Sequence, residues 1–460
     1  MTGPAKVPSS VTGPVAVVGF AVTGQAVARA LRAAGTQVVA VEDAPTAEHE
    51  AAARSLGVEL VTSPDGDRLA AVVGRCELVV VSPGVTPRHP VFSLVPPSRL
   101  VSEIELAYRL SPIPIVAVTG TNGKTTVTIL VTAMLVASGV RAEASGNIGA
   151  PLISTVTGGE ADVAVAEVSS FQLALSTSFR PRVAAWLNVA ENHLDWHRTY
   201  HDYVAAKERI WANQRDGDVA VANCDDPVVI VAARRSAGRL VTFGTTGDGY
   251  RLEGGSFLAP GGGLLATSAD LARDLPHDRL NALAALATAI EAGGTPDGCR
   301  AALRVTEPPA HRLTHVATVD GVEYYDDSKA TTPAAVAAAI RGFESVVLIL
   351  GGRNKGLDLS AVRRAVDDQA ALVVRGVVAI GEAGADVAAA FAPDYGVITA
   401  SSMGEAVAAA AGLARPGDTV LLSPACASFD WYESYATRGD DFAAEVRRLA
   451  VTDGAGRGGA

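Results

Sequence analysis

The stretch Ile115-Val-Ala-Val-Thr-Gly-Thr-Asn-Gly-Lys-Thr-Thr126 carries the strongest structural signal in this chain of 460 residues. An apolar, β-branched run leads into two glycines, a lysine and two threonines, and a helical pattern, Val127–Leu135, follows. A strand, a tight loop and a helix start in this order hold a nucleoside triphosphate, because loop N–H groups and the positive end of the helix dipole face the phosphates. Lys124 would neutralise phosphate charge, and the Thr125 hydroxyl would bind Mg²⁺. The usual first loop glycine is replaced by Val118, so the loop is a variant, and a Gly-Lys-Thr triplet alone also fits an ordinary helix start.

Short β-branched runs alternate with alanine-rich helical segments along the chain, which predicts an α/β protein with parallel sheets. Proline-rich breaks at residues 96–114 and 306–310 predict three domains: a Rossmann-like domain at 1–110, a central P-loop mononucleotide-binding domain at 111–308, and a C-terminal Rossmann-like domain at 309–460 with a tail disordered from about Thr452. The glycine-rich residues 244–270 predict a small β excursion or a loop region. The predicted strands are Val15–Val18, Gln37–Val41, Leu78–Val81, Ile115–Val118, Val163–Ala166, Val183–Val189, Val346–Leu350, Val377–Ile380 and Thr419–Leu422, and the predicted helices include Gln25–Ala34 and Leu280–Glu291.

The composition is typical of a well-cored enzyme, with 48% hydrophobic and 19% charged residues. A net charge of −11 argues against nucleic acid and anionic membranes as partners. The cysteines (Cys76, Cys224, Cys299 and Cys426) are scattered without paired metal spacing, which suits a reducing compartment. No apolar run approaches the ~20 residues that span a bilayer, and Met1–Ser10 lacks a signal-peptide core. We therefore expect a soluble, cytoplasmic protein.

The first domain contains two exposed turns at strand ends. Val15–Gly24 is a strand, a glycine turn and a helix start, with Ala21 at the middle position of a dinucleotide-binding fingerprint. Glu42-Asp43 ends the next strand, and Ser82–Val85 follows the third. Because open α/β sheets bind ligands at this edge, the turns predict a site for a nucleotide-bearing substrate. A nicotinamide-dependent dehydrogenase would explain residues 15–43 but nothing after them.

Polar residues follow two strands of the central domain. Glu167 ends a hydrophobic strand, where P-loop enzymes keep an acidic residue for Mg²⁺. His193 and Asp195 lie after the next strand and could serve metal or phosphate, or simply form a loop. Lys207 lies on an amphipathic helix, where a lysine is more often solvated, and its spacing alone gives it no special role.

The motifs T-G-T-N-G-K-T-T, G-N-I-G, E-V-S-S-F-Q-L, N-x-x-x-N-H-L-D and Y-x-x-A-K-x-R-I occur in the order found in the Mur ligases, which this chain resembles over about residues 15–445. Later motifs agree, at Leu280–Leu286, His311–Leu313, Asp326–Thr331, Gly351–Lys355 and Leu422–Asp430. The chain is most similar to the members that add D-glutamate to UDP-N-acetylmuramoyl-L-alanine. The resemblance implies an ATP-dependent amide ligase of peptidoglycan precursor synthesis that uses Mg²⁺, expected as two ions, and an acyl phosphate. We expect a monomer.

The resemblance also assigns residues. It implies catalytic roles for Lys124, Lys207, His193 and Lys329, with Lys207 carbamylated. The implied ATP site comprises Gly120, Thr121, Asn122, Gly123, Lys124, Thr125, Thr126, Asn281, Arg312 and Asp327, the last two from the third domain. The implied substrate contacts are Val22, Thr23 and Asn147 for the UDP sugar and Thr331, Lys355, Ser428 and Tyr435 for the amino acid, although ordinary loop packing also fits Ser428 and Tyr435. The implied Mg²⁺ ligands are Thr125, Glu167, His193 and carbamylated Lys207.

Two departures from the family pattern stand out. Asp278 occupies a position where the family often has asparagine, so it could accept a hydrogen bond from adenine or ribose but not donate one. The uracil loop, Glu42-Asp43-Ala44, lacks an expected arginine. Alternatives within the fold are a ligase for another amino acid and a folylpolyglutamate-type synthase, and outside it a P-loop switch protein, which would not need the third-domain motifs.

Overall fold

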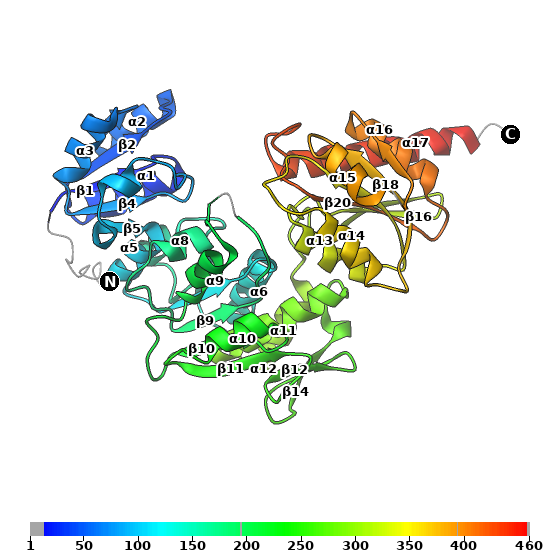
Figure 1. Cartoon of the computed structure of the whole chain (residues 1–460). Coiled ribbons are helices and arrows are strands. Elements are labelled where there is room, and N and C mark those ends of the chain that lie inside the picture. Colours follow the sequence, from blue (N-terminus) through cyan, green and yellow to red (C-terminus); the bar gives the residue numbers. More distant parts are fainter. Residues whose placement is uncertain (1–12, 194–195, 393, 458–460) are drawn as a thin grey trace. The chain divides into compact units, whose positions relative to one another are not determined.

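A computed structural model describes residues 13–193, 196–392 and 394–457 (Figure 1). Three sheets succeed one another along the chain, and each lies within one of the three predicted domain ranges. The expectation about Met1–Ser10 falls outside the described residues. Among the helices of the described part, none is long and apolar enough to cross a membrane.

The first sheet is parallel, with strand order β3-β2-β1-β4-β5. Its apolar strands are buried on both faces: Val15 and Val17 join one core cluster, whereas Ala16 and Val18 join another. This two-sided burial explains why the strands are continuous hydrophobic runs. The elements are β1 Val15–Val18, α1 Val22–Ala33, β2 Val38–Glu42, α2 Ala47–Leu56, β3 Glu59–Thr62, α3 Gly66–Gly74, β4 Leu78–Val81, α4 Val91–Leu94, η1 Pro97–Arg99, β5 Leu100–Ser102 and α5 Glu103–Leu110.

The second sheet has nine strands in the order β14-β13-β12-β11-β10-β9-β6-β8-β7. All pairings among the strands from β6 to β12 are parallel. Strands β12, β13 and β14 pair antiparallel and form the β excursion predicted for residues 244–270. The strands are β6 Ile115–Thr119, β7 Ala142–Gly146, β8 Val163–Glu167, β9 Val183–Trp186, β10 Val219–Asn223, β11 Arg239–Gly244, β12 Tyr250–Glu253, β13 Ser256–Leu258 and β14 Leu264–Thr267. The helices are α6 Lys124–Ala137, α7 Leu152–Gly158, α8 Ser170–Ala174, α9 Tyr200–Glu208, α10 Pro227–Ala233, η2 Ser268–Asp270, α11 Pro276–Glu291 and α12 Pro296–Val305.

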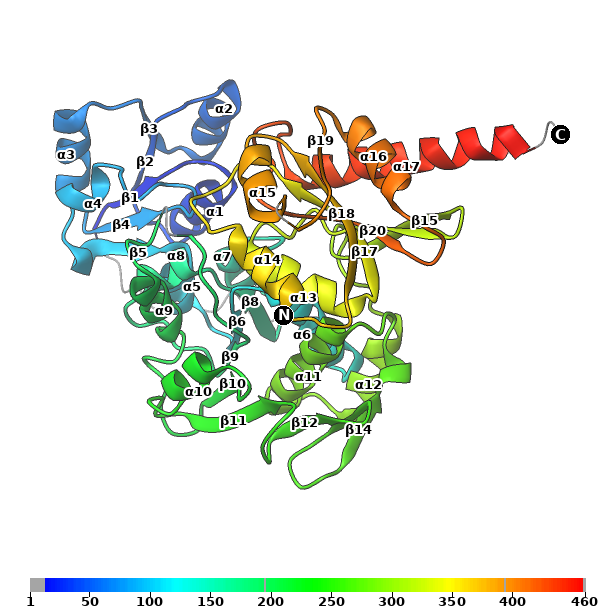
Figure 2. The ribbon, with the colours of Figure 1, turned by 45° about the vertical axis from the view of Figure 1, so that its right-hand side comes forward.

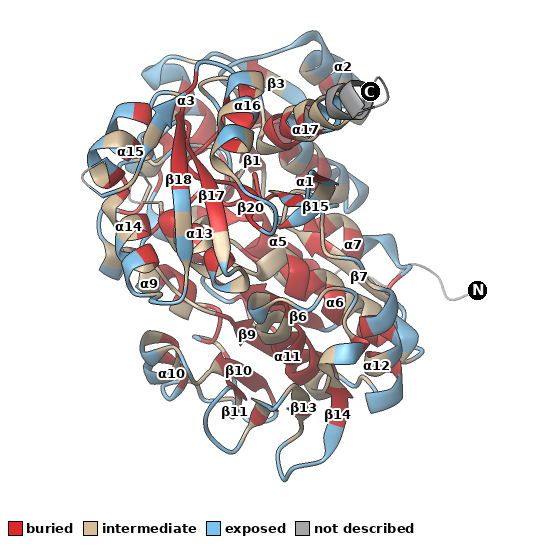
Figure 3. Cartoon of the chain, turned by 90° about the vertical axis from the view of Figure 1, so that its right-hand side faces the viewer, coloured by how far each residue is buried: buried red, intermediate tan, exposed pale blue. Residues whose placement is uncertain are grey.

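The third sheet has the order β15-β16-β20-β17-β18-β19, with only β15 and β16 antiparallel among its described pairings. Figure 2 shows β17, β18 and β20 beside α13 and α14, and Figure 3 shows these strands mostly buried. Alternate residues of β17 enter separate clusters, Leu348 on one face and Ile349 on the other. The elements are β15 Thr314–Val319, β16 Val322–Asp326, α13 Pro333–Ala339, η3 Ile340–Gly342, β17 Ser345–Gly351, α14 Ser360–Asp367, β18 Val373–Ile380, α15 Gly384–Phe391, β19 Val397–Thr399, α16 Met403–Leu413, β20 Thr419–Ala425 and α17 Tyr435–Arg457.

The first two sheets share one hydrophobic core. A single cluster of buried side chains contains Leu31 and Val101 from the first sheet's region and Leu152 and Phe179 from the second. Helix α5 packs against α7 and α8, which joins the two regions. These two sheets accordingly belong to one compact unit, which ends at Thr306, and a second unit comprises residues 190–200, 273–278 and the chain from Glu307.

Several element boundaries differ from the sequence expectations, mostly by one to four residues, and three differences bear on the site or the tail. Strand β9 ends at Trp186 rather than at Val189, because the chain turns there toward the loop that follows β6. Helix α6 begins at Lys124, three residues before the predicted start. Helix α17 continues to Arg457 through residues expected to be disordered, since extending a helix needs no new nucleation.

Candidate active site

The loop between β6 and α6 is a compact turn closed by two glycines. Gly123 has φ +83°, which favours glycine, and a Cβ there would lie 2.4 Å from Asn281 Oδ1. Asn281 therefore packs directly on the loop, and its contact with ATP stays a prediction. Val118, at the position of the missing glycine, is a fully buried residue of β6. The variant loop is short because the strand continues through that position.

Asn188 holds this loop, a role that sequence reasoning did not assign. Its Oδ1 accepts hydrogen bonds from the backbone N–H of Thr121 (3.1 Å) and Asn122 (2.9 Å), and its Nδ2 donates to the Asn122 carbonyl (3.2 Å). The Tyr203 hydroxyl lies 3.0 Å from Thr121 Oγ1. The first residue of the N-x-x-x-N-H-L-D motif and the tyrosine of Y-x-x-A-K were the available signals. Lys124 Nζ also contacts the loop, donating to the carbonyls of Gly120 (2.9 Å) and Thr121 (3.0 Å).

The predicted Mg²⁺ ligands Thr125 and Glu167 are in direct contact. Thr125 Oγ1 donates to Glu167 Oε2 at 2.7 Å, and the carboxylate is almost fully buried at the end of β8. Asn147 Nδ2 donates to the other oxygen, Oε1, at 2.8 Å, and its backbone N–H donates to the Glu167 carbonyl. A hydroxyl and a buried, oriented carboxylate are suitable oxygen ligands for Mg²⁺.

Lys207 is buried beside the same loop, with 1% of its surface exposed. The expectation that a lysine on an amphipathic helix is solvated is therefore wrong for Lys207, because the face of α9 that carries it packs against the interior. Its Nζ donates to the Gly120 carbonyl (2.8 Å) and Thr119 Oγ1 (3.3 Å) and lies 4.8 Å from the centroid of the Tyr203 ring. Burial, followed by the charge of Lys124, lowers the pKa of Lys207 well below its ordinary value.

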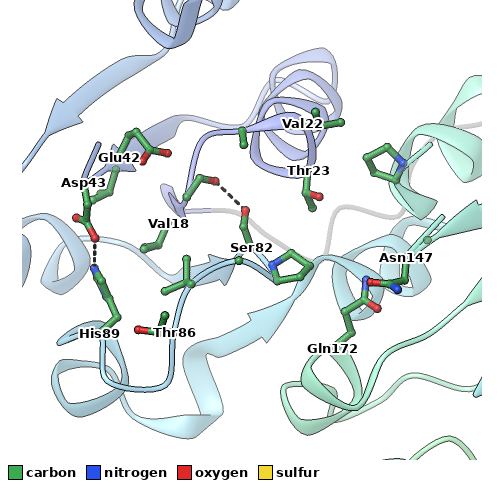
Figure 4. A pocket seen from close by; sticks show the side chains of 18 of the residues that line it. Val18, Val22, Thr23, Glu42, Asp43, Ser82, Thr86, His89, Asn147 and Gln172 are labelled. Atoms are coloured by element: carbon green, nitrogen blue, oxygen red, sulfur yellow. Dashed lines mark hydrogen bonds and ion pairs between the residues drawn. The ribbon is translucent and has the colours of Figure 1, made fainter. Parts of the chain in front are cut away.

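A pocket of about 630 Å³ lies in the same unit (Figure 4). The turn after β1 contributes Val22 and Thr23, and the turn after β7 contributes Asn147, so the three predicted UDP-sugar contacts line one cavity. Figure 4 shows Asp43 and His89 on one side of this cavity and Asn147 on the other. Polar groups at both sides and apolar walls between them are typical of a small-molecule site.

The acidic residues of the pocket have different surroundings. Both oxygens of Glu42 accept backbone hydrogen bonds, from Phe20 (2.7 Å) and Ala44 (3.1 Å). Asp43 Oδ2 instead lies 3.0 Å from His89 Nε2. His89 Nδ1 accepts the N–H of Val91 at 3.1 Å, so Nε2 carries the proton that is donated to Asp43. His89 and Asp43 thus form the polar side of the pocket where an arginine was expected.

The predicted residues of the C-terminal domain gather around β16 and β20. Asp327 is buried, and it accepts a hydrogen bond from Ser423 Oγ at 2.8 Å. Burial raises the pKa of Asp327 to about 7, although the Ser423 hydrogen bond and the Arg312 charge oppose the shift. Lys329 Nζ lies 3.7 Å from the centroid of the Tyr435 ring. Arg312 is thus close enough to Asp327 for their charges to interact, and Lys329 lies over the Tyr435 ring.

The loops that carry the remaining predicted amino-acid contacts are paired. Arg353 and Ala427 exchange backbone hydrogen bonds of 2.8 and 3.0 Å, which places the Gly351–Lys355 loop beside the loop of Ser428. Thr331 follows Lys329, whose carbonyl accepts its N–H at 2.9 Å. His193 belongs to the second unit, in positive-φ backbone (+55°), and Asp195 falls outside the described residues. The meeting of His193, Arg312, Asp327 and Lys329 with the P-loop stays a prediction.

Comparisons with known proteins identify the family of this chain. The profile of the Mur ligase middle domain matches residues 118–289, and that of the Mur ligase, glutamate ligase domain matches residues 311–426. The chain belongs to the Mur ligase family. It is 43% identical to the UDP-N-acetylmuramoylalanine–D-glutamate ligase of Frankia casuarinae, over 94% of each chain. The protein of that name from Desulfosudis oleivorans is 42% identical, over 95% of this chain and 97% of the relative.

Solved structures share the fold at low sequence identity. The UDP-N-acetylmuramate-alanine ligase of Thermotoga maritima matches with a TM-score of 0.59 and 18% identity, over 95% of this chain and 100% of that one. A pseudomurein peptide ligase type C from Methanothermus fervidus matches with a TM-score of 0.58 and 18% identity, over 89% and 96%. The predicted α/β class with three sheets is therefore confirmed as the fold of this family.

Proposed function

We propose that this protein is an ATP-dependent ligase that joins D-glutamate to UDP-N-acetylmuramoyl-L-alanine during peptidoglycan precursor synthesis in the cytoplasm. The names of the 42–43% identical relatives support the substrates. One structural observation carries the proposal for this chain. Asn147 lines the pocket and donates to Glu167, which also accepts the hydroxyl of Thr125 on the nucleotide loop. The pocket and the phosphate-binding loop are thus joined through two hydrogen bonds to one carboxylate.

The chemistry of amide formation explains the need for this junction. A carboxylate does not react with an amine until one of its oxygens becomes a leaving group. In the proposed reaction, a substrate carboxylate oxygen attacks the γ-phosphorus of ATP and ADP leaves. The amine nitrogen of D-glutamate then attacks the acyl carbon, and phosphate leaves with the electrons of the broken C–O bond. Such phosphoryl transfer depends mainly on positioning and charge neutralisation, roles that suit Lys124 at the loop and Lys329 in the C-terminal domain.

The residues present fit a bound Mg²⁺. Thr125 and Glu167 supply oxygen atoms, and Asn147 fixes the orientation of the carboxylate. Among the described residues, no group of three or more histidine, cysteine or acidic side chains is arranged so that it could hold a metal ion by itself. This agrees with the way that proteins usually hold Mg²⁺, with one or two carboxylates and the phosphates of the substrate. When bound, the ion would neutralise phosphate charge during the transfer, and His193 is the further predicted ligand.

Carbamylation of Lys207 is part of the proposal. The amine is buried, its hydrogen-bond acceptors are a carbonyl and a hydroxyl, and no ion pair joins it to a carboxylate among the described residues. The lowered pKa favours loss of the amine proton, and the uncharged form of the amine can attack CO₂, forming an N–C bond and releasing a proton. The resulting carbamate would place anionic oxygens near Lys124 and Glu167. It would convert a buried amine into an oxygen ligand for a hard cation.

Phosphate release tests the proposed function. Purified protein with Mg²⁺, ATP and UDP-N-acetylmuramoyl-L-alanine should release phosphate only when D-glutamate is added, and mass spectrometry should show the substrate heavier by one glutamyl residue. L-glutamate, L-alanine and D-alanine serve as matched controls. Amino-acid-independent turnover would instead indicate a P-loop switch protein, and turnover with another amino acid would indicate a different ligase.

A further inference from the structure

The segment that carries Arg312 has an unfavourable backbone. His311 has φ +60° and Leu313 has φ +50°, so residues with a Cβ occupy the left-handed region on both sides of Arg312. Such backbone persists only where neighbouring groups hold it. It also determines the direction in which the intervening side chain leaves the chain. The groups that hold this segment therefore control where Arg312 points.

Arg273 is the principal side chain on this segment. Its Nη1 donates to the carbonyl oxygens of Arg312 (2.5 Å) and Leu313 (2.7 Å). One guanidinium nitrogen thus bridges two successive carbonyls in the strained turn. A second support comes from His311, whose Nδ1 lies 2.6 Å from Asp326 Oδ2.

Asp278 in turn fixes Arg273. Its Oδ2 accepts from Arg273 Nε at 2.7 Å, and its Oδ1 accepts from Nη2 at 2.8 Å, an arrangement in which both oxygens face one guanidinium. His277 Nε2 lies 3.2 Å from Arg273 Nη2 and 3.3 Å from Asp278 Oδ1. Burial raises the pKa of Asp278, but the hydrogen bonds from Arg273 and His277 bring it down to about 2.

This network explains a departure from the family pattern. An asparagine at position 278 would present one acceptor and one donor, and the donor would face the donors of Arg273. A carboxylate matches the guanidinium at both positions. Both carboxylate oxygens of Asp278 are engaged in an ion pair with Arg273, and a hydrogen bond from adenine or ribose to Asp278 stays a prediction.

We propose that Arg273, held by Asp278, is a positioning residue for Arg312: it fixes the strained His311–Leu313 backbone and thereby aims the Arg312 guanidinium at the phosphates of ATP. The inference rests on the proposed function, in which Arg312 is an ATP contact. The same segment also supports Asp327, whose carboxyl group accepts the N–H of Leu313. Loss of Arg273 would disturb both of the C-terminal residues that are predicted to bind ATP.

The test compares single and double variants of the full-length protein. Arg273→Met should raise the KM for ATP between about tenfold and about a hundredfold, while the KM for UDP-N-acetylmuramoyl-L-alanine changes less than about twofold. Asp278→Asn should give a smaller rise. The double variant should raise the KM for ATP no further than Arg273→Met does, because both changes disrupt the same ion pair. Arg363→Met, which removes another guanidinium with two carboxylate partners, is the matched control and should leave both KM values unchanged.

The outcomes separate this inference from the proposed function. Absence of D-glutamate-dependent phosphate release by the wild-type protein refutes the proposed function, whatever the variants do. With an active wild type, an unchanged KM for ATP in Arg273→Met overturns the positioning role, and so does an equal rise in the KM values of all three substrates. If Arg273→Met does not fold by circular dichroism, Arg273→Lys decides the question. Lysine keeps the positive charge but lacks the paired donors of the guanidinium group. Arg273→Lys should therefore show the same selective rise in the KM for ATP.

Discussion

Glu103 and Glu105 lie two residues apart at the start of α5, and their carboxylates have opposite surroundings. Glu103 Oε1 accepts one backbone hydrogen bond, from Ile153 at 2.6 Å, and its buried Oε2 has no hydrogen-bond partner among the described residues. Glu105 accepts hydrogen bonds from residues 177–179 and pairs with Arg109 at 2.8 Å. Burial raises the pKa of Glu103 to about 7. Burial also acts to raise that of Glu105, but the Ser178 and other hydrogen bonds outweigh it and lower the pKa below its ordinary value.

Glu103→Gln should therefore stabilise the protein at high pH. Between its unfolded pKa of about 4.3 and its folded pKa of about 7, the folded protein keeps a proton that the unfolded chain has lost, so the contribution of Glu103 to stability falls as pH rises. Above pH 7, the cost of the buried charge is on the order of 4 kcal/mol. Urea unfolding should show a larger gain for Glu103→Gln at pH 8 than at pH 5, and equal gains would contradict this.

Glu105→Gln should have the opposite pH dependence. Because the folded pKa of Glu105 is lowered, its carboxylate stabilises the protein above its unfolded pKa, and this stabilisation is lost as pH falls through the folded pKa. The variant should be destabilised by about 1–3 kcal/mol at pH 7, and the deficit should shrink toward pH 3.5. Thermal unfolding over this range provides the measurement. A pH-independent deficit would show that packing, rather than charge, dominates.

Asn147→Ala should weaken Mg²⁺ binding, in addition to any effect on the UDP-sugar pocket that Asn147 lines. Asn147 orients Glu167, and loss of such a partner typically costs about 10–100-fold in metal affinity. The Mg²⁺ concentration for half-maximal phosphate release should rise by that factor. Asn213→Ala, which removes an amide bonded only to carbonyls of Thr177 and Phe179, is the control. An unchanged Mg²⁺ requirement in Asn147→Ala would argue against a metal at Glu167.

Asn188→Ala should raise the KM for ATP by about tenfold. The variant removes the acceptor of two loop N–H groups, and one lost hydrogen bond of about 1.4 kcal/mol corresponds to a factor of ten. Steady-state kinetics at saturating co-substrates measures the effect. Asn188→Asp tests it further, because it keeps the acceptor but places a negative charge beside the phosphates. If neither change affects the KM for ATP, the loop does not depend on Asn188.

Lys207→Ala should lose activity, and added bicarbonate should not restore it. In the wild-type protein, ¹³C-bicarbonate should produce a carbamate signal in the ¹³C NMR spectrum, because burial lowers the pKa of the amine and keeps water away from it. Lys207→Arg, which cannot form a carbamate, should lack this signal. Full activity in Lys207→Ala would remove the argument for a carbamate ligand.

The parts of the site that the sequence predicted are those carried by short, contiguous patterns. The strand-loop-helix signal at Ile115–Thr126 located the P-loop, and a carboxylate at a strand end pointed to Glu167. Lys207 could not be recognised as buried from its own segment, because the packing of α9 against distant chain decides its exposure. From the sequence, Asn188 belongs to the end of a strand. In the structure, the chain turns after β9, and this turn directs the Asn188 amide toward the loop.

The support of Arg312 was beyond the sequence for a related reason. Arg273 and Asp278 are only five residues apart, so their pairing is local, yet the carbonyl that Arg273 binds on Arg312 lies 39 residues further along the chain. The sequence does not show which backbone carbonyl a side chain will bind, because every residue has one. Positive φ at His311 and Leu313 likewise has no signature in side chains that normally avoid it.

The buried cluster that runs from Leu31 and Val101 to Leu152 and Phe179 limits how this protein can be taken apart. Separating the chain near residue 111 would expose apolar surface on both fragments. We therefore expect that the first 110 residues cannot be expressed alone or replaced by the corresponding residues of a relative. A chimaera that keeps activity must replace the facing surfaces of α5 and α7 together. The predicted UDP-sugar pocket can therefore be exchanged only together with the sheet that carries the nucleotide loop.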